Sequence, residues 1–116
     1  MIVTTIYLPI RGNDGKPFDG KIRQRIRARL VSEFGSYSIN PGQHGAWTEQ
    51  GTTYRDESEA LVVALTSWLE LPRWFEFVRF IQTELVQLSM YIEIAGIPEV
   101  VDMRRERKDG LVIAQR

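Results

Sequence analysis

The chain has 116 residues, a formal net charge of zero, an apolar fraction of 43% and a charged fraction of 26%, all ordinary for one globular domain. The balanced charge gives no bulk attraction to nucleic acid or to acidic substrates, and the absence of cysteine excludes disulfides, thiol nucleophiles and cysteine-held metals. No apolar run approaches the roughly 20 residues of a membrane span, and the N-terminus lacks the basic start of a signal peptide. We therefore expect a cytoplasmic protein.

Residues 2–10 predict a strand rich in β-branched residues. Its two faces would carry Ile2, Thr4, Ile6, Leu8 and Ile10 on one side and Val3, Thr5 and Tyr7 on the other. Residues 11–17 are rich in turn formers. Their glycine spacing matches neither a Walker loop nor a dinucleotide fingerprint, so we expect a plain turn.

Residues 19–34 predict a helix that Asp19 caps and Gly35 ends. Apolar residues recur at every fourth position and form one stripe. The other positions carry five basic residues, Lys21, Arg23, Arg25, Arg27 and Arg29, against the single acid Glu33. Such a face can bind phosphate, but a solvated face paired with carboxylates elsewhere in the fold is the favoured interpretation.

Residues 37–40 predict a short strand that stops at Pro41-Gly42. Residues 46–54 predict a hairpin turning at Gln50-Gly51, in which Trp47 faces Tyr54. Residues 60–66 form a strand with apolar side chains on both faces, so we expect both faces to be covered.

Residues 72–88 give the clearest helical pattern, with Phe75 and Phe80 outside the main stripe, which suggests a second surface buried by a neighbouring chain. Residues 90–97 predict the last strand, which Pro98 ends. We expect one domain over residues 1–103 and a charged tail over residues 104–116, with 111–114 as a candidate short added strand.

The order of these elements is β-α-β-β-α-β, which predicts an α+β ferredoxin-like fold with a four-stranded antiparallel sheet and two helices on one face. The opposite face would carry Val3, Thr5, Tyr7, Val62, Ala64, Tyr91 and Glu93 and is too apolar to face water alone. Two copies could pack there as a homodimer, or Tyr7 and Tyr91 could stack nucleic-acid bases. The basic helix would lie on the far side of the sheet, which favours the homodimer.

A catalytic candidate is His44 with Asp56 and Glu57, because the hairpin register places His44 opposite Glu57. A carboxylate beside an imidazole supports general acid–base chemistry, although a loop histidine near a surface carboxylate is the favoured interpretation. Trp47 and Tyr54 could line a ligand site or simply pack together. One histidine and no cysteine leave no metal cluster, and no cofactor motif appears.

The chain carries a set of short motifs: the Pro-Ile-Arg-Gly-Asn-Asp-Gly-Lys-Pro-Phe loop of residues 9–18, Phe34-Gly35, Gly45-Ala-Trp47, Gly51-x-x-Tyr54-x-Asp56-Glu57, Trp74 and Gln87. Together these motifs resemble those of a group of small uncharacterised bacterial proteins. The resemblance covers Leu8 to Ile94 and implies a ferredoxin-like fold. It transfers no catalytic residue, and it adds Gly45, Gly51 and Gln87 to the candidate positions.

Three functional hypotheses follow. The first is a self-associating binding or regulatory module without catalytic activity that takes a partner or a small ligand. The second is a small enzyme of the dimeric α+β barrel type that uses His44 with Asp56 or Glu57. The third, which the balanced charge disfavours, is nucleic-acid binding through the basic helix over residues 19–34.

Overall fold

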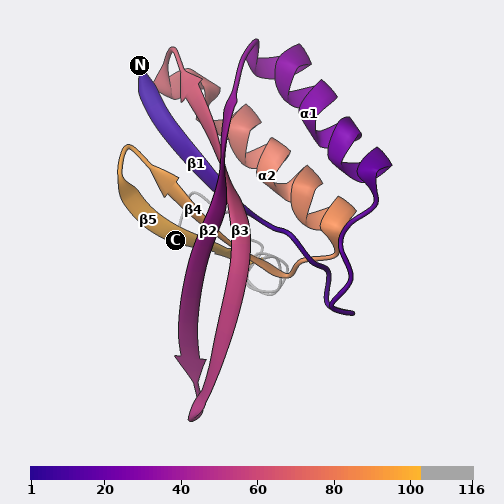
Figure 1. Cartoon of the computed structure of the whole chain (residues 1–116). Coiled ribbons are helices and arrows are strands. Elements are labelled where there is room, and N and C mark those ends of the chain that lie inside the picture. Colours follow the sequence, from indigo (N-terminus) through magenta and orange to yellow (C-terminus); the bar gives the residue numbers. More distant parts are fainter. Residues whose placement is uncertain (103–116) are drawn as a thin grey trace.

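The computed structural model describes residues 1–102, apart from the side chains of Trp47 and Glu49. The elements in chain order are β1 (Ile2–Pro9), α1 (Gly20–Phe34), β2 (Ser38–Glu49), β3 (Thr52–Leu65), the 3₁₀ turn η1 (Trp68–Glu70), α2 (Leu71–Leu85), β4 (Ser89–Ile94) and β5 (Ile97–Asp102). Figure 1 shows α1 and α2 side by side on one face of the sheet. The predicted tail over residues 104–116, with its candidate strand, lies outside the described residues.

The sheet is antiparallel with the order β2-β3-β1-β4-β5. The first four strands and the two helices follow the predicted ferredoxin-like arrangement. The predicted strand number is wrong, because a fifth strand extends the edge beside β4. The reason is a tight turn at Ala95-Gly96, where both residues have positive φ (52° and 81°), so the chain reverses and pairs with β4 again.

Two prolines that were predicted to end strands lie inside strands. Pro98 lies inside β5 and pairs with Glu93, which an edge strand tolerates because one side of its backbone has no ladder. Pro41 lies inside β2, which continues to Glu49 through a bulge between Asn40 and Gln43. The bulge accommodates Pro41-Gly42 without ending the strand.

The helix ends have identifiable causes. Asp19 caps α1 by accepting from the amide of Lys21 at 2.8 Å, and Gly35, at a φ of 84°, ends the helix as predicted. Helix α2 stops at Leu85 rather than at Leu88, because Val86 takes a left-handed conformation with a φ of 53°. Leu88 is therefore outside the helical stripe and is 47% exposed.

The core lies between the helices and one face of the sheet. Its fully buried side chains include Ile6, Leu30, Leu61, Val63, Trp74, Phe77, Val78, Ile81 and Ile92. Phe75 is buried in this core and Phe80 packs against it. The chain itself therefore buries Phe75, which needs no neighbouring chain, whereas Phe80 is only partly buried and its burial by a neighbouring chain stays a prediction.

The opposite face of the sheet, here called the open face, has no helix over it (Figure 1). Val3, Tyr91 and Val100 on this face are 52%, 46% and 40% exposed. Ala64 of β3 is also exposed, so the expectation that both faces of this strand are covered does not hold within the described chain. Among residues 1–102, the helices are too short or too polar to cross a membrane.

Candidate functional site: a groove beside the β2–β3 arm

The hairpin formed by β2 and β3 extends well beyond the rest of the sheet (Figure 1). The pairing of β1 with β3 ends at Pro9 and Ser58, and one further backbone hydrogen bond joins Ile10 N to Glu57 O at 3.2 Å. Residues 43–57 form a two-stranded ribbon that we call the arm. Its turn has positive φ at both Gln50 (51°) and Gly51 (81°), which is the geometry of a type I′ turn. The predicted hairpin register is therefore correct.

A groove of about 780 Å³ lies beside the base of the arm. Pockets of this size accept small organic ligands. The lining combines three carboxylates and one guanidinium with aromatic, amide and hydroxyl side chains. The lining residues are Tyr7, Pro9, Arg11, Gly12, Asn13, Gln43, His44, Gly45, Ala46, Asp56, Glu57, Ser58, Gln87, Ser89, Met90, Tyr91 and Glu93.

Two tyrosines and a carboxylate meet where the groove borders the open face. Strands β1 and β4 place the rings of Tyr7 and Tyr91 with centroids 5.3 Å apart. The Tyr7 hydroxyl donates to Glu93 Oε1 at 3.0 Å. Burial, followed by the hydrogen bond to Glu93, raises the pKa of Tyr7 above its ordinary value of 10.0. At neutral pH the neutral hydroxyl therefore orients one oxygen of Glu93.

The structure brings the predicted trio of His44, Asp56 and Glu57 to the same groove. His44 pairs with Glu57 across the arm, whereas Asp56 pairs with Gly45. Consecutive residues of a strand point to opposite faces, so His44 and Glu57 share one face of the ladder and Asp56 belongs to the other. Within the described residues, no hydrogen bond or ion pair joins His44 to Glu57. The chain thus assembles these groups without a formed catalytic dyad.

Gln87 also reaches the groove, where it belongs to a small amide network. Its Nε2 donates to Leu85 O at 3.2 Å and to Asn13 Oδ1 at 3.4 Å. Asn13 in turn donates to Val86 O at 3.1 Å. These contacts tie the loop after β1 to the end of α2 and hold two amide groups at the groove wall.

Of the predicted aromatic pair, the structure places Tyr54 outside the groove lining. Trp47 and Tyr54 are backbone partners in the arm, as the register predicted. Tyr54 is 45% exposed and does not line the groove. The predicted packing of the Trp47 side chain lies outside what the structure describes. Gly51 forms the turn and Gly45 lines the groove.

Sequence reasoning left Tyr7, Tyr91, Glu93 and Arg11 out of the candidate site. The alternation along β1 and β4 had already placed the first three on one face of the sheet. The sequence did not show that the arm and the loop after β1 enclose the end of the open face where these side chains lie. That arrangement depends on the pairing of segments far apart in the sequence.

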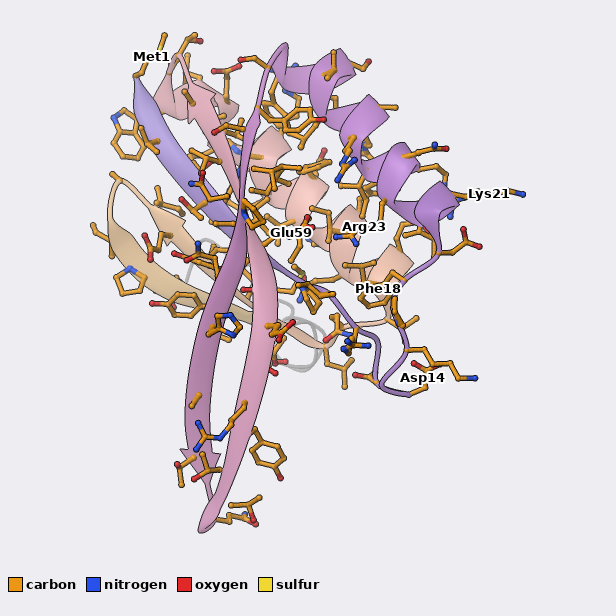
Figure 2. All side chains as sticks on the ribbon, in the orientation of Figure 1. Met1, Asp14, Phe18, Lys21, Arg23 and Glu59 are labelled. Atoms are coloured by element: carbon orange, nitrogen blue, oxygen red, sulfur yellow. The ribbon has the colours of Figure 1, made fainter. Side chains whose placement is uncertain are left out.

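Three of the five basic side chains of α1 are paired with carboxylates. Arg23 contacts Glu59 at 2.7 Å, Arg25 contacts Glu84 at 3.0 Å and Arg29 contacts Glu33 at 2.6 Å. Figure 2 shows Arg23 on α1 near Glu59 on β3, while Lys21 points away. This is the favoured interpretation of the basic run, a face paired with carboxylates. Among residues 1–102, no group of three or more His, Asp or Glu side chains is arranged to hold a metal ion.

No family model matches the chain, and no curated protein matches it either. Solved structures do share its fold. A phage SAM lyase in its apo state superposes with a TM-score of 0.63 and 16% identity, over 87% of this chain and 88% of the lyase. The same lyase in complex with S-methyl-5′-thioadenosine gives a TM-score of 0.59 over the same shares of the two chains.

Two divalent cation tolerance proteins of the CutA1 type are also similar. The one from Ehrlichia chaffeensis has a TM-score of 0.54 and 12% identity, over 80% of this chain and 77% of that one. The one from Thermus thermophilus has a TM-score of 0.51 and 21% identity, over 96% of this chain and 95% of that one. At such identities the likeness shows a shared ferredoxin-like α+β fold.

Proposed function

We propose that the chain is a self-associating, non-catalytic module that binds a small adenosyl-type molecule in the groove. The observation that carries the proposal is the cluster of Tyr7, Tyr91 and Glu93 at the wall of a groove of about 780 Å³. The phage lyase of the same fold has been solved with S-methyl-5′-thioadenosine, which supports an adenosyl-sized ligand on this framework. We also propose a cytoplasmic location, which fits the absence of cysteine.

The lining chemistry suits a nucleoside. The half-exposed ring of Tyr91 offers an aromatic face on which a base can stack. Carboxylates such as Glu93 accept hydrogen bonds from ribose hydroxyls, as acidic residues do in dinucleotide sites. Gln87 has committed both of its N–H groups within the amide network and can accept from the edge of a base through Oε1, while Asn13 keeps one N–H that can donate.

Isothermal titration with S-methyl-5′-thioadenosine tests this ligand. We expect Tyr91→Ala and Glu93→Gln each to weaken binding by about five- to 150-fold, because each weakens a direct contact worth about 1–3 kcal/mol. Tyr54→Ala and Glu76→Gln are matched controls, since Tyr54 and Glu76 do not line the groove. Binding that is unchanged in both groove variants, or absent in the wild type, would refute the proposal.

Self-association would cover the open face, as we propose for a homodimer. Val3, Ala64 and Val100 leave an apolar surface there that a second copy can bury. Size-exclusion chromatography with light scattering measures the mass directly. We expect an oligomer that Val3→Asp dissociates, and a strict monomer at high micromolar concentration would count against the interface.

A second candidate is a small enzyme that uses acid–base chemistry in the same groove. The observation that favours it is the placement of His44 opposite Glu57, with Asp56 also at the wall. Incubation with SAM, followed by detection of released S-methyl-5′-thioadenosine, is the direct test. Turnover that falls in His44→Ala or Glu57→Gln would support the enzyme, whereas ligand binding without turnover supports the binding module.

A further inference from the structure

The outer edge of the arm is a backbone surface that the proposed function does not use. β2 is the edge strand of the sheet, and no other strand among residues 1–102 pairs with its outer side. Between Ser58 and the turn at Gln50-Gly51, the arm consists of only two strands, β2 and β3. A two-stranded ribbon is marginally stable in water unless another strand or a helix packs against it.

The turn shows which backbone groups face outward. A two-residue turn at Gln50-Gly51 is closed by the hydrogen-bonded pair Glu49 and Thr52. Pairs then alternate, so Thr48, Ala46 and His44 direct their amides and carbonyls away from β3. The hydroxyls of Thr48 and Thr53 lie 3.0 Å apart, which fits the closer spacing of a non-hydrogen-bonded pair.

This edge lacks the usual protection against strand addition. Exposed edges are commonly blunted by lysine, proline or a bulge. Pro41 and the bulge between Asn40 and Gln43 protect only the inner part of β2. The outer stretch over residues 43–48, Gln-His-Gly-Ala-Trp-Thr, contains no lysine, arginine, carboxylate or proline.

We propose that a second copy of this chain adds its own β2 to this edge, antiparallel to the first. A second copy carries the same unpaired edge, and a twofold axis near Ala46 lets each edge satisfy the other. Residues 43–48 contain no lysine, arginine or carboxylate, and the antiparallel pairing places His44 beside Thr48 rather than beside another histidine. The two arms then form one four-stranded ribbon.

The contact between the two β2 strands also bears on ligand binding in the groove, and this part of the inference rests on the proposed function. His44, Gly45 and Ala46 line the groove and lie on the shared edge. The second copy therefore stands beside the groove and closes its arm side. The contact uses the backbone of the arm and leaves the open face available for the other interface.

Proline substitution tests the edge with little effect on the hairpin itself. Ala46→Pro combined with Thr48→Pro removes two outward amides and no amide that bonds to β3. Ala46→Val with Thr48→Val is the matched control, because valine keeps both amides and suits a strand. Light scattering should give the wild type and the control the same oligomeric mass, and the proline variant half of it or less. A wild-type monomer, or a proline variant of unchanged mass, overturns the proposal.

A second measurement tests the same contact in case the proline variant does not fold. The chain has no cysteine, so single substitutions report contacts cleanly. We expect Ala46→Cys, beside the twofold axis, to form a disulfide between copies on oxidation. Ser32→Cys, exposed on α1, should remain monomeric on a denaturing gel. If Ala46→Cys cross-links no better than Ser32→Cys, the pairing of β2 with β2 is wrong.

Titration with S-methyl-5′-thioadenosine separates this inference from the ligand proposal. The titration uses Thr48→Pro and Thr48→Val alone, because Thr48 does not line the groove, and binding at least tenfold weaker in Thr48→Pro than in Thr48→Val supports closure of the groove by the second copy. Loss of the oligomer in a chain that never binds the ligand supports the edge contact and refutes the ligand. If the proline variant keeps the oligomeric mass of the wild type and binds the ligand normally, the edge contact is refuted and the ligand proposal still stands.

Discussion

Replacing Tyr7 with phenylalanine removes one hydroxyl and tests how the groove wall is held. The hydroxyl donates to Glu93 at 3.0 Å in a half-buried setting. A hydrogen bond to a charged acceptor contributes about 1.5–3 kcal/mol when shielded, and partial exposure reduces this to about 1 kcal/mol. For a chain of 116 residues, such a loss lowers the melting temperature by about 3–6 °C.

Circular dichroism during heating and urea unfolding would measure this loss. Tyr37→Phe is the control, because Tyr37 is also half-buried and its hydroxyl has no hydrogen bond within the described residues. The control should change the free energy of unfolding by less than about 0.5 kcal/mol. If Tyr7→Phe is as stable as the wild type, the hydrogen bond to Glu93 contributes nothing to the free energy of unfolding. The hypothesis that this bond stabilises the groove wall would then be wrong.

The same pair of proteins gives a pH prediction with a defined sign. The folded pKa of Tyr7 is raised above 10.0, so the unfolded chain loses this proton first as the pH rises. The stability linked to the neutral hydroxyl is fully present below about pH 10 and is lost as the pH rises through the folded pKa. The stability difference between the wild type and Tyr7→Phe should therefore shrink above about pH 10, and a difference that grows there would contradict the assignment.

Three further predictions concern the core, the edge strand and the basic helix. Phe77→Ala should cost about 3–5 kcal/mol in urea unfolding, because Phe77 is fully buried between the helices and the sheet. Gln82→Ala should cost about 2–4 kcal/mol and increase hydrogen exchange in β5, because Gln82 donates to Leu88 O and Val101 O at 3.3 and 3.0 Å. Filter binding should show no salt-dependent retention of nucleic acid, since Arg23, Arg25 and Arg29 are already paired, and steep salt dependence would contradict this.

Periodicity predicts the parts of this fold that bury one face of a regular element. The alternation in β1 and the helical stripe of α2 were enough to assign Ile6 and Phe77 to the core. The fifth strand was missed because Pro98 was interpreted as a stop, although an edge strand tolerates proline. Whether a strand lies at an edge is a property of the whole sheet, which a local pattern does not contain.

The candidate site was predicted only where local geometry determines it. The two-residue turn fixes the register of the arm, and this register correctly placed His44 opposite Glu57. The contribution of Tyr7, Arg11 and Tyr91 depends on how β1, β4 and the loop after β1 meet the arm. The packing of these segments against the arm depends on contacts between residues far apart in the sequence. A short sequence motif therefore does not predict it.

The bulge in β2 divides one hairpin into two parts whose registers are set separately. The core determines the pairing of Ile39 with Leu61, and the turn determines the pairing of Thr48 with Thr53. The irregular stretch between Asn40 and Gln43, where Gly42 has a φ of 72°, absorbs the difference between them. The hairpin can therefore change length at its tip without shifting any core contact, which makes Gln50-Gly51 a natural insertion point for a fluorescent label or an affinity peptide.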